Sequence, residues 1–229
     1  MTSTEDAVLG VVIVAAGSGQ RFGDAAKVFS ALDGQPVLLH SLQLFLSMPE
    51  VHHIVVVLGA HTIEEGTALV HNRRYQKVQV CLGGESRRDS VRAGLAALPK
   101  EVELVAVHDA GRPLAQRDMV RRVVAAAREC GAAAPVVPVS DTVVRIGPNR
   151  QVMGVEERDG LAAVQTPQVA RRDWLESSLR SGTSNTDEGG ALLSAGYPVM
   201  TVDGAPENIK LTWPGDLAIA EAILRRRNP

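Results

Sequence analysis

The stretch AAGSGQRFG at residues 15–23, followed by Lys27, decides how the rest of the chain is interpreted. It comes directly after the apolar run VLGVVIV at residues 8–14, which is typical of a strand buried on both faces of a parallel sheet. Glycines after such a strand let backbone N–H groups approach a ligand closely, and Arg21 and Lys27 add positive charge. The stretch therefore predicts a phosphate-binding loop at the carboxyl end of the first strand.

Two familiar glycine loops do not fit this stretch. The dinucleotide fingerprint G-x-G-x-x-G does not match, because Gly23 comes one residue too late after Gly17 and Gly19. A Walker A loop requires Gly-Lys followed by Ser or Thr, and the stretch has neither. An NAD-dependent dehydrogenase is therefore a poor interpretation. An ordinary strand-to-helix turn with incidental charges remains the alternative.

The composition limits the classes of protein to consider. A chain of 229 residues is long enough for one α/β domain with a sizeable core. The net charge of −2, with no basic stripe and only scattered aromatic residues, gives no indication of nucleic-acid binding. No apolar run has transmembrane length, residues 1–7 do not resemble a signal peptide, and Cys81 and Cys130 form no disulfide framework. We expect a cytoplasmic protein without a membrane contact.

Predicted strands and helices alternate along most of the chain. After residues 8–14, further strands are predicted at 53–58, 77–82, 104–108 and 132–139. Helices are predicted at 37–48 and 116–130, and two more are predicted between them, one that begins at residue 62 and one that ends at about residue 98. This alternation predicts a doubly wound, mostly parallel open sheet, and no linker or repeat divides residues 1–229.

The alternation breaks at residues 142–155, which predict two short strands about a Gly-Pro-Asn turn. An isolated hairpin is marginal in water, so it must fold over its own domain or embrace a partner subunit. Beyond it we predict a strand at 162–165, a helix from 173, a helix at 188–195, a strand at 198–202 and a helix at 214–224.

Two more segments carry polar residues directly after predicted strands. Gly84, with Arg87 and Ser90, resembles a second anion-binding helix start, although simple helix capping by Ser86 explains it about as well. Asp109 follows the strand at 104–108 and is a carboxylate able to hold Mg²⁺ against phosphates, or else a turn-forming residue. We expect the adjacent His108 to be structural, because no second His or Cys offers metal-ligand spacing.

Eight motifs in a fixed order give the chain a specific resemblance. They are AAGSGQRFG with Lys27, GGESRRDSVRAGL, HDAGRP, SDTV, ER-G at 157–160, TPQ, TDEG and ENIKLT. With these motifs the chain resembles the 2-C-methyl-D-erythritol 4-phosphate cytidylyltransferases of the non-mevalonate isoprenoid pathway. The resemblance implies a Rossmann-like nucleotidyltransferase fold that joins CTP to methylerythritol phosphate and releases pyrophosphate. The chain departs from the usual family pattern at Ala26, Gly111, Glu157 and Glu207.

The resemblance also implies roles for individual residues. Arg21 and Lys27 would stabilise the developing charge, and Arg158 and Lys210 would hold the substrate phosphate, with Mg²⁺ bound near Asp109. The nucleotide would contact Ala15, Ala16, Gly17, Gly19, Gly84, Arg87, Ser90 and Asp109. Further substrate contacts are implied at Arg112, Thr142, Thr166, Thr186 and Glu207, as well as at Arg158 and Lys210.

The resemblance finally gives the hairpin a partner. It implies a homodimer in which residues of about 140–158 form an arm that carries Arg158 into the neighbouring site. A cytidylyltransferase acting on ribitol 5-phosphate or a related polyol phosphate is the nearest alternative. A non-catalytic nucleotide-binding regulatory module is a distant one, because Arg21, Lys27, Asp109, Arg158 and Lys210 are all retained.

Overall fold

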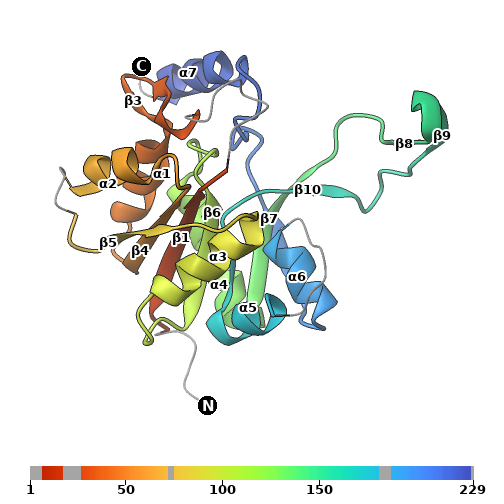
Figure 1. Ribbon diagram of the computed structural model, residues 1–229. Coiled ribbons are helices and arrows are strands. Elements are labelled where there is room, and N and C mark those ends of the chain that lie inside the picture. Colours follow the sequence, from red (N-terminus) through yellow and green to blue (C-terminus); the bar gives the residue numbers. More distant parts are fainter. Residues whose placement is uncertain (1–6, 18–26, 72–74, 181–186, 228–229) are drawn as a thin grey trace.

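A computed structural model of the chain describes residues 7–17, 27–71, 75–180 and 187–227. Its centre is an eight-stranded sheet in the order β10-β7-β11-β6-β1-β4-β5, in which β12 also pairs with β7 (Figure 1). The strands are β1 (Leu9–Ala15), β4 (Val51–Leu58), β5 (Val78–Leu82), β6 (Leu104–Asp109), β7 (Ala132–Pro138), β10 (Ala162–Val164), β11 (Gln168–Arg171) and β12 (Met200–Asp203).

The sheet has a parallel half and a mixed half. β1 is parallel to β4 and β6, and β4 is parallel to β5. On the other side, β11 runs antiparallel between β6 and β7, β10 is antiparallel to β7, and β12 is parallel to β7. The predicted mostly parallel α/β sheet is confirmed. β11 was not predicted, because its four residues QVAR show neither alternation nor a long apolar run.

Helices cover both faces of the sheet, as a doubly wound fold requires. They are α1 (Val37–Leu46), α2 (Ile63–His71), α3 (Arg87–Ala97), α4 (Arg117–Cys130), α5 (Arg172–Ser178), α6 (Glu188–Ser194) and α7 (Asp216–Arg227). Alternate residues of β1 enter two cores, because Val11 and Ile13 pack with α1 and α4 while Val12 packs with α3 and α5. In Figure 1, α3 and α5 lie in front of the sheet and α4 lies behind it.

A third, smaller core attaches the C-terminal helix to the N-terminal part of the chain. Leu32, Val37, Leu114 and Leu211 are buried there together with Ala220 of α7. Leu32 belongs to a small hairpin of β2 (Ala31–Leu32) and β3 (Gln35–Pro36), which follows the short helix η3 (Lys27–Phe29). This packing brings the last helix next to the segment that begins with Lys27.

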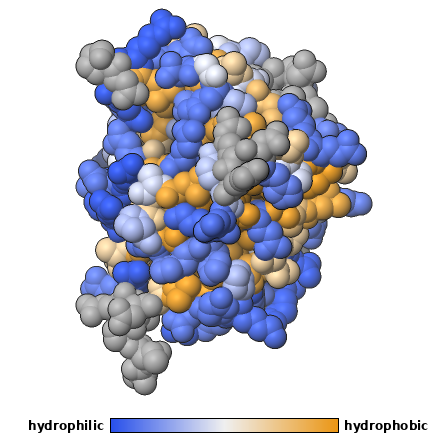
Figure 2. Space-filling model, turned by 90° about the vertical axis from the view of Figure 1, so that its left-hand side faces the viewer, coloured by the Kyte–Doolittle hydropathy of each residue, from blue (hydrophilic) through white to orange (hydrophobic). Residues whose placement is uncertain are grey.

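The predicted hairpin forms a separate two-stranded sheet away from the body (Figure 1). It consists of β8 (Val144–Ile146) and β9 (Val152–Val155), with the short helix η4 (Pro148–Arg150) between them. Four apolar side chains of this hairpin are exposed: Ile146, Val152, Met153 and Val155. By contrast, the face beside α2 and β5 is mixed, with apolar patches between hydrophilic residues (Figure 2).

None of the helices in the described ranges is long and apolar enough to cross a membrane.

Candidate active site

The strand ends that carry the predicted polar residues open into one cavity of about 360 Å³. It lies at the carboxyl ends of β1, β5 and β6, where ligands bind in open α/β sheets. Its lining comprises Val14, Ala15, Ala16, Gly17, Lys27, Val28, Gly84, Glu85, Ser86, Arg87, Ser90, Asp109, Gly111 and Lys210. A larger hollow of about 720 Å³ lies at the opposite edge, beside Ala7, Leu104 and Arg171, away from the predicted residues.

Asp109, the last residue of β6, is the carboxylate at the centre of this cavity. Its Oδ1 accepts a hydrogen bond from Arg87 Nη2 at 3.0 Å, and its Oδ2 accepts one from Lys210 Nζ at 2.6 Å. Burial alone would raise the pKa of Asp109, but the charges of Arg87 and Lys210 hold it far below its ordinary value. Asp109 is therefore ionised throughout the physiological pH range.

Behind Asp109, Arg87 is held by a second buried carboxylate. Arg87 Nη1 donates to Glu188 Oε1 at 2.6 Å, and Nη2 donates to Glu188 Oε2 at 3.0 Å. Charge thus alternates across the site along four side chains, in the order Glu188, Arg87, Asp109 and Lys210. Sequence reasoning placed Glu188 only as the start of a helix, although its position in the TDEG motif was a signal that it serves the site.

The backbone of Asp109 is fixed by a buried hydrogen-bond chain. Its N–H donates to Thr166 Oγ1 at 3.1 Å, and Thr166 Oγ1 lies 3.1 Å from His108 Nδ1. His108 Nε2 lies 3.2 Å from the Arg112 carbonyl oxygen, which only accepts, so we assign the ring hydrogen to Nε2 and let the Thr166 hydroxyl donate to Nδ1. Burial lowers the pKa of His108 to about 4, so the ring is neutral. His108 is structural, as the sequence predicted.

The turn at residues 207–212 brings the two motif lysines into the same cavity. Lys210 reaches Asp109, and the carbonyl oxygen of the next residue, Leu211, accepts a hydrogen bond from Lys27 Nζ at 2.9 Å. Leu211 N–H in turn donates to the Gly111 carbonyl at 2.8 Å, which ties the turn to the segment after β6. A phosphate in this cavity would face both ammonium groups and the Arg87 guanidinium.

The start of α3 forms the wall opposite this turn. Ser86 Oγ accepts from the Asp89 N–H at 3.1 Å, so the capping interpretation of Ser86 is confirmed. The Ser90 hydroxyl, which is buried beside the cavity, donates to the Ser86 carbonyl at 3.0 Å. A Cβ on Gly84 would lie 2.3 Å from Asp89 Cβ, so only glycine allows this wall to close. Gly84 has this packing requirement in addition to its predicted place beside a nucleotide.

The structure brings most of the predicted nucleotide residues together. Ala15, Ala16, Gly17, Gly84, Arg87, Ser90 and Asp109 line the cavity with Lys27 and Lys210. Gly19, Arg21 and Thr186 lie outside the described residues. Glu85 and Gly111 also line the cavity, and neither was predicted as a site residue.

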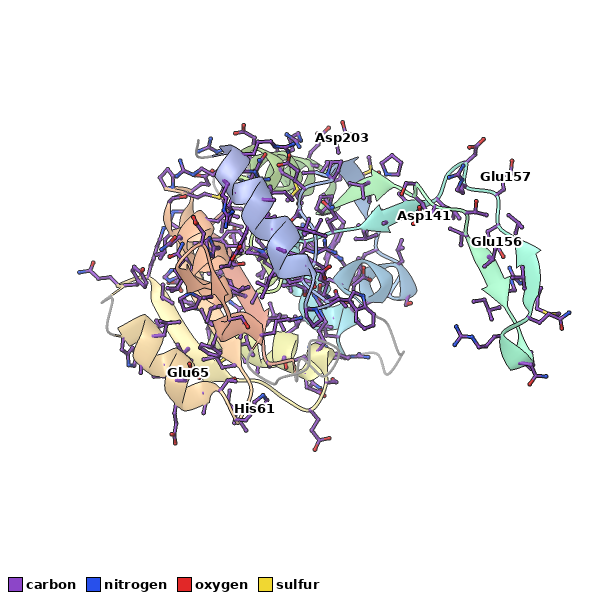
Figure 3. All side chains as sticks on the ribbon, turned by 90° about the horizontal axis from the view of Figure 1, so that it is seen from above. His61, Glu65, Asp141, Glu156, Glu157 and Asp203 are labelled. Atoms are coloured by element: carbon purple, nitrogen blue, oxygen red, sulfur yellow. The ribbon has the colours of Figure 1, made fainter. Side chains whose placement is uncertain are left out.

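Several predicted substrate residues lie outside the cavity lining. Arg112 is directed to backbone, with Nη1 donating to the Asn208 carbonyl at 2.8 Å, and its buried Nε has no hydrogen-bond partner among the described residues. Thr142 and Arg158 are exposed at the base of the hairpin, where Arg158 donates to the Ser140 carbonyl. The neighbouring Asp141 and Glu157 mark this region in Figure 3, well to one side of the body. Glu207 faces the end of α7, where it pairs with arginines.

Metal binding at this site would depend on Asp109. Within the described ranges, no three His, Cys, Asp or Glu side chains gather as ligands for a metal ion. Mg²⁺ is commonly held by one or two carboxylates together with substrate phosphates and water, so the Asp109 carboxylate in an anion-binding cavity suits it. The residues present therefore fit a metal that arrives with a nucleotide.

Comparison with known proteins agrees with the resemblance seen in the motifs. Residues 9–226 match the family model IspD, 2-C-methyl-D-erythritol 4-phosphate cytidylyltransferase. A protein of that name from Dehalococcoides mccartyi (strain ATCC BAA-2266 / KCTC 15142 / 195) is 40% identical over 220 residues, covering 95% of this chain and 96% of the relative.

Solved structures agree as well. A 4-diphosphocytidyl-2C-methyl-D-erythritol synthase from Anaerococcus prevotii superposes with a TM-score of 0.85 at 25% identity, covering 98% of this chain and 99% of that one. A 2-C-methyl-D-erythritol 4-phosphate cytidylyltransferase from Thermus thermophilus gives a TM-score of 0.75 at 29% identity, covering 93% and 98%. With the fold, the ordered motifs and the relatives in agreement, this chain belongs to the 2-C-methyl-D-erythritol 4-phosphate cytidylyltransferase family.

Proposed function

We propose that this protein transfers CMP from CTP to 2-C-methyl-D-erythritol 4-phosphate, giving 4-diphosphocytidyl-2-C-methyl-D-erythritol and pyrophosphate in isoprenoid precursor synthesis. The observation that carries the proposal is the cavity that gathers Lys27, Lys210 and Asp109, in a chain of this family. Residues 1–229 would act as one nucleotidyltransferase domain. The free thiols of Cys81 and Cys130 suit a reducing compartment, which supports a cytoplasmic location.

The chemistry requires charge neutralisation more than proton transfer. A phosphate oxygen of the polyol phosphate attacks the α-phosphorus of CTP, the new P–O bond forms, and the bond to the pyrophosphate oxygen breaks. Because the second pKa of a phosphate monoester is about 6, the nucleophile is largely ionised and needs no general base. Lys27 and Arg21 would stabilise charge at the α-phosphate and the leaving group, and Lys210 would hold the attacking phosphate.

Asp109 would hold Mg²⁺ against the CTP phosphates, and the ion would supply positive charge there. Arg87 and Glu188 keep the Asp109 carboxylate oriented for this task. Ala15, Ala16, Gly17, Gly84 and Ser90 would surround the cytosine and ribose, together with Gly19. The small side chains in this part of the lining support a close approach of the backbone to the base.

The second substrate would be held partly by another subunit. We place Arg158 and Thr142 in the site of a partner copy, and Arg112, Thr166 and Thr186 as contacts to the polyol phosphate. The exposed apolar side chains of β8 and β9 and the position of Arg158 outside its own cavity support a homodimer joined through the arm of residues 140–158.

A two-substrate assay tests the function. Purified protein with CTP and Mg²⁺ is expected to release pyrophosphate with methylerythritol phosphate, and much less with ribitol 5-phosphate, while ATP and GTP serve as nucleotide controls. Faster turnover with ribitol 5-phosphate would assign the protein to that related reaction. Binding of CTP without pyrophosphate release from either polyol phosphate would indicate a regulatory module.

The Lys27→Ala variant tests the role of the loop lysine. We expect turnover to fall by more than about a hundredfold, because a principal charge-stabilising donor is removed. Lys100→Ala is the matched control, since Lys100 lines the hollow at the opposite edge of the sheet and should leave turnover unchanged. A Lys27→Ala protein with near-normal turnover would contradict the assignment.

A further inference from the structure

Glu207 begins the turn that carries Lys210, and its carboxylate is held by the last turn of α7. Oε2 of Glu207 accepts two hydrogen bonds from Arg227, at 3.0 Å from Nε and 2.8 Å from Nη2. Oε1 is paired with Arg226. Both oxygens of Glu207 are therefore occupied by groups of the same chain.

Arg227 also connects this carboxylate to the segment that follows β6. Its Nη1 donates to the Leu114 carbonyl oxygen at 3.0 Å. Leu114 is buried in the third core beside Leu211, which lies one residue after Lys210 in the turn. One guanidinium thus joins three parts of the chain: the end of α7, the segment after the HDAGRP motif, and the start of the lysine turn.

Other hydrogen bonds also anchor the residues on either side of Glu207: Ala205 N–H donates to Gln165 Oε1 at 3.1 Å, and the Asn208 carbonyl accepts from Arg112 Nη1 at 2.8 Å. Downstream, Asn208 Nδ2 donates to the Thr166 carbonyl at 3.0 Å, and Leu211 N–H donates to the Gly111 carbonyl at 2.8 Å. Glu207 lies three residues before Lys210, so its attachment to α7 restricts where the turn starts. A shift of the turn would move Lys210 Nζ away from Asp109.

We infer that Glu207 and Arg227 form a clamp that positions the lysine turn, so that Glu207 serves the reaction through Lys210 and not by binding a substrate hydroxyl. The inference rests on the proposed function, in which Lys210 holds the attacking phosphate. It makes Arg227 a positioning residue supplied by the C-terminal helix.

The exposed fractions of the two arginine side chains show that Arg227 is the one to substitute in a test. Its side chain is 20% exposed and Glu207 is 31% exposed, whereas Arg226 is 71% exposed. Exposed ion pairs contribute little, while a partly buried guanidinium with several fixed acceptors holds its partners in place. Arg225, which is 76% exposed and pairs with Glu221, offers the matched control on the same helix.

The test compares Arg227→Met, Glu207→Gln and the double variant in steady-state assays with CTP and methylerythritol phosphate. We expect each single variant to lower kcat/KM for the polyol phosphate by about tenfold to a hundredfold, the scale of a displaced catalytic group. The double variant should be no worse than either single one, because the two residues act as a unit. CTP affinity should stay within about twofold, since the lining beside the nucleotide is unchanged. Arg225→Met should behave as wild type.

Arg227→Lys adds a second check, because a lysine keeps the charge but lacks the planar fork that reaches both acceptors. It should recover only part of the loss. Wild-type kcat/KM in Arg227→Met, with a large loss in Glu207→Gln, would overturn the clamp and make Glu207 a substrate ligand. Additive losses in the double variant would overturn it too.

Hydrogen exchange gives a readout that does not require turnover. Amides of residues 205–212 should exchange faster in Arg227→Met than in wild type, and Arg225→Met should leave them unchanged. Unchanged exchange in Arg227→Met would overturn the clamp even in an active enzyme. Faster exchange in a protein that transfers no CMP would uphold the clamp while the proposed function fails.

Discussion

His108 and Asp109 are neighbours in the chain whose pKa values are both lowered, for opposite physical reasons. Burial excludes the charged form of His108 and lowers its pKa to about 4. Asp109 is kept charged by Arg87 and Lys210, which outweigh the burial that would raise its pKa. A neutral imidazole next to a charged carboxylate lets one residue fix the backbone while the other binds cations.

The neutral His108 predicts a pH dependence of stability. Between its unfolded pKa of 6.5 and its folded pKa of about 4, the unfolded chain binds a proton that the folded chain excludes, so stability falls as the pH decreases through this window. The loss from pH 7 to pH 5 should be about 2 kcal/mol from this group. Urea unfolding in metal-free buffer at both pH values measures it, and His108→Gln should show a smaller difference. An identical difference in the variant would contradict the assignment.

At the scale of residues, the sequence predicted the centre of the site better than its supports. Lys27 and Asp109 were predicted from the residues themselves, because polar residues at strand ends meet at one edge of a sheet, and the family resemblance implied Lys210. Glu188 was missed because it pairs with Arg87 across 101 positions, and no local pattern indicates such a contact. The clamp of Glu207 by Arg227 was missed for the same reason.

At the scale of elements, the strands with continuous apolar runs and the amphipathic helices were predicted from periodicity. The prediction failed at β11, whose short sequence becomes a strand only because β6 and β7 pair with it on both sides. The turn from α4 into β7, by contrast, is indicated by a glycine at the end of the helix. Gly131 ends α4 with a φ of 91°, and its α-carbon faces the Trp174 ring, which stacks on Tyr197 at 4.7 Å.

Gly131→Ala tests this turn against a matched glycine. A Cβ at Gly131 would lie 2.3 Å from Trp174 Cη2, whereas one at Gly196, with a φ of 84°, would meet no atom of the described part of the chain within 4 Å. We expect Gly196→Ala to cost about 1 kcal/mol from backbone strain alone, and Gly131→Ala to cost at least about 2 kcal/mol because the ring must also move. Denaturant unfolding of both variants measures the difference. Equal losses of unfolding free energy would show that the Trp174 ring moves aside at no cost.

At the scale of the whole molecule, the arm separates the predicted site into two groups of residues. The cavity lies at the sheet edge, while Arg158 is exposed beside Ser140 at the base of the hairpin. Its neighbour Glu157 lies well to one side of the body (Figure 3). The sequence predicted the hairpin from its turn and its short strands. In the proposed homodimer the hairpin would pack on a second surface, which the periodicity of one chain does not encode.

Subunit complementation tests the shared site. Mixed dimers of Lys27→Ala and Arg158→Ala chains contain one site with both wild-type residues if Arg158 acts in the partner's cavity. Random exchange of equal amounts should then restore about a quarter of wild-type activity, since half the dimers are mixed and each has one intact site. If Arg158 acts within its own chain, mixing restores nothing. Arg158→Ala alone should weaken use of the polyol phosphate and leave CTP binding intact.

The exposed arm also has a consequence for the newly made chain in the cell. Ile146, Val152, Met153 and Val155 stand on a two-stranded hairpin that the core does not cover. Such a segment is open to proteases and chaperones until another surface shields it. If the second copy of the proposed homodimer supplies that surface, the survival of each new chain would depend on how soon it meets another, and the cellular abundance of the protein would depend on its own rate of synthesis.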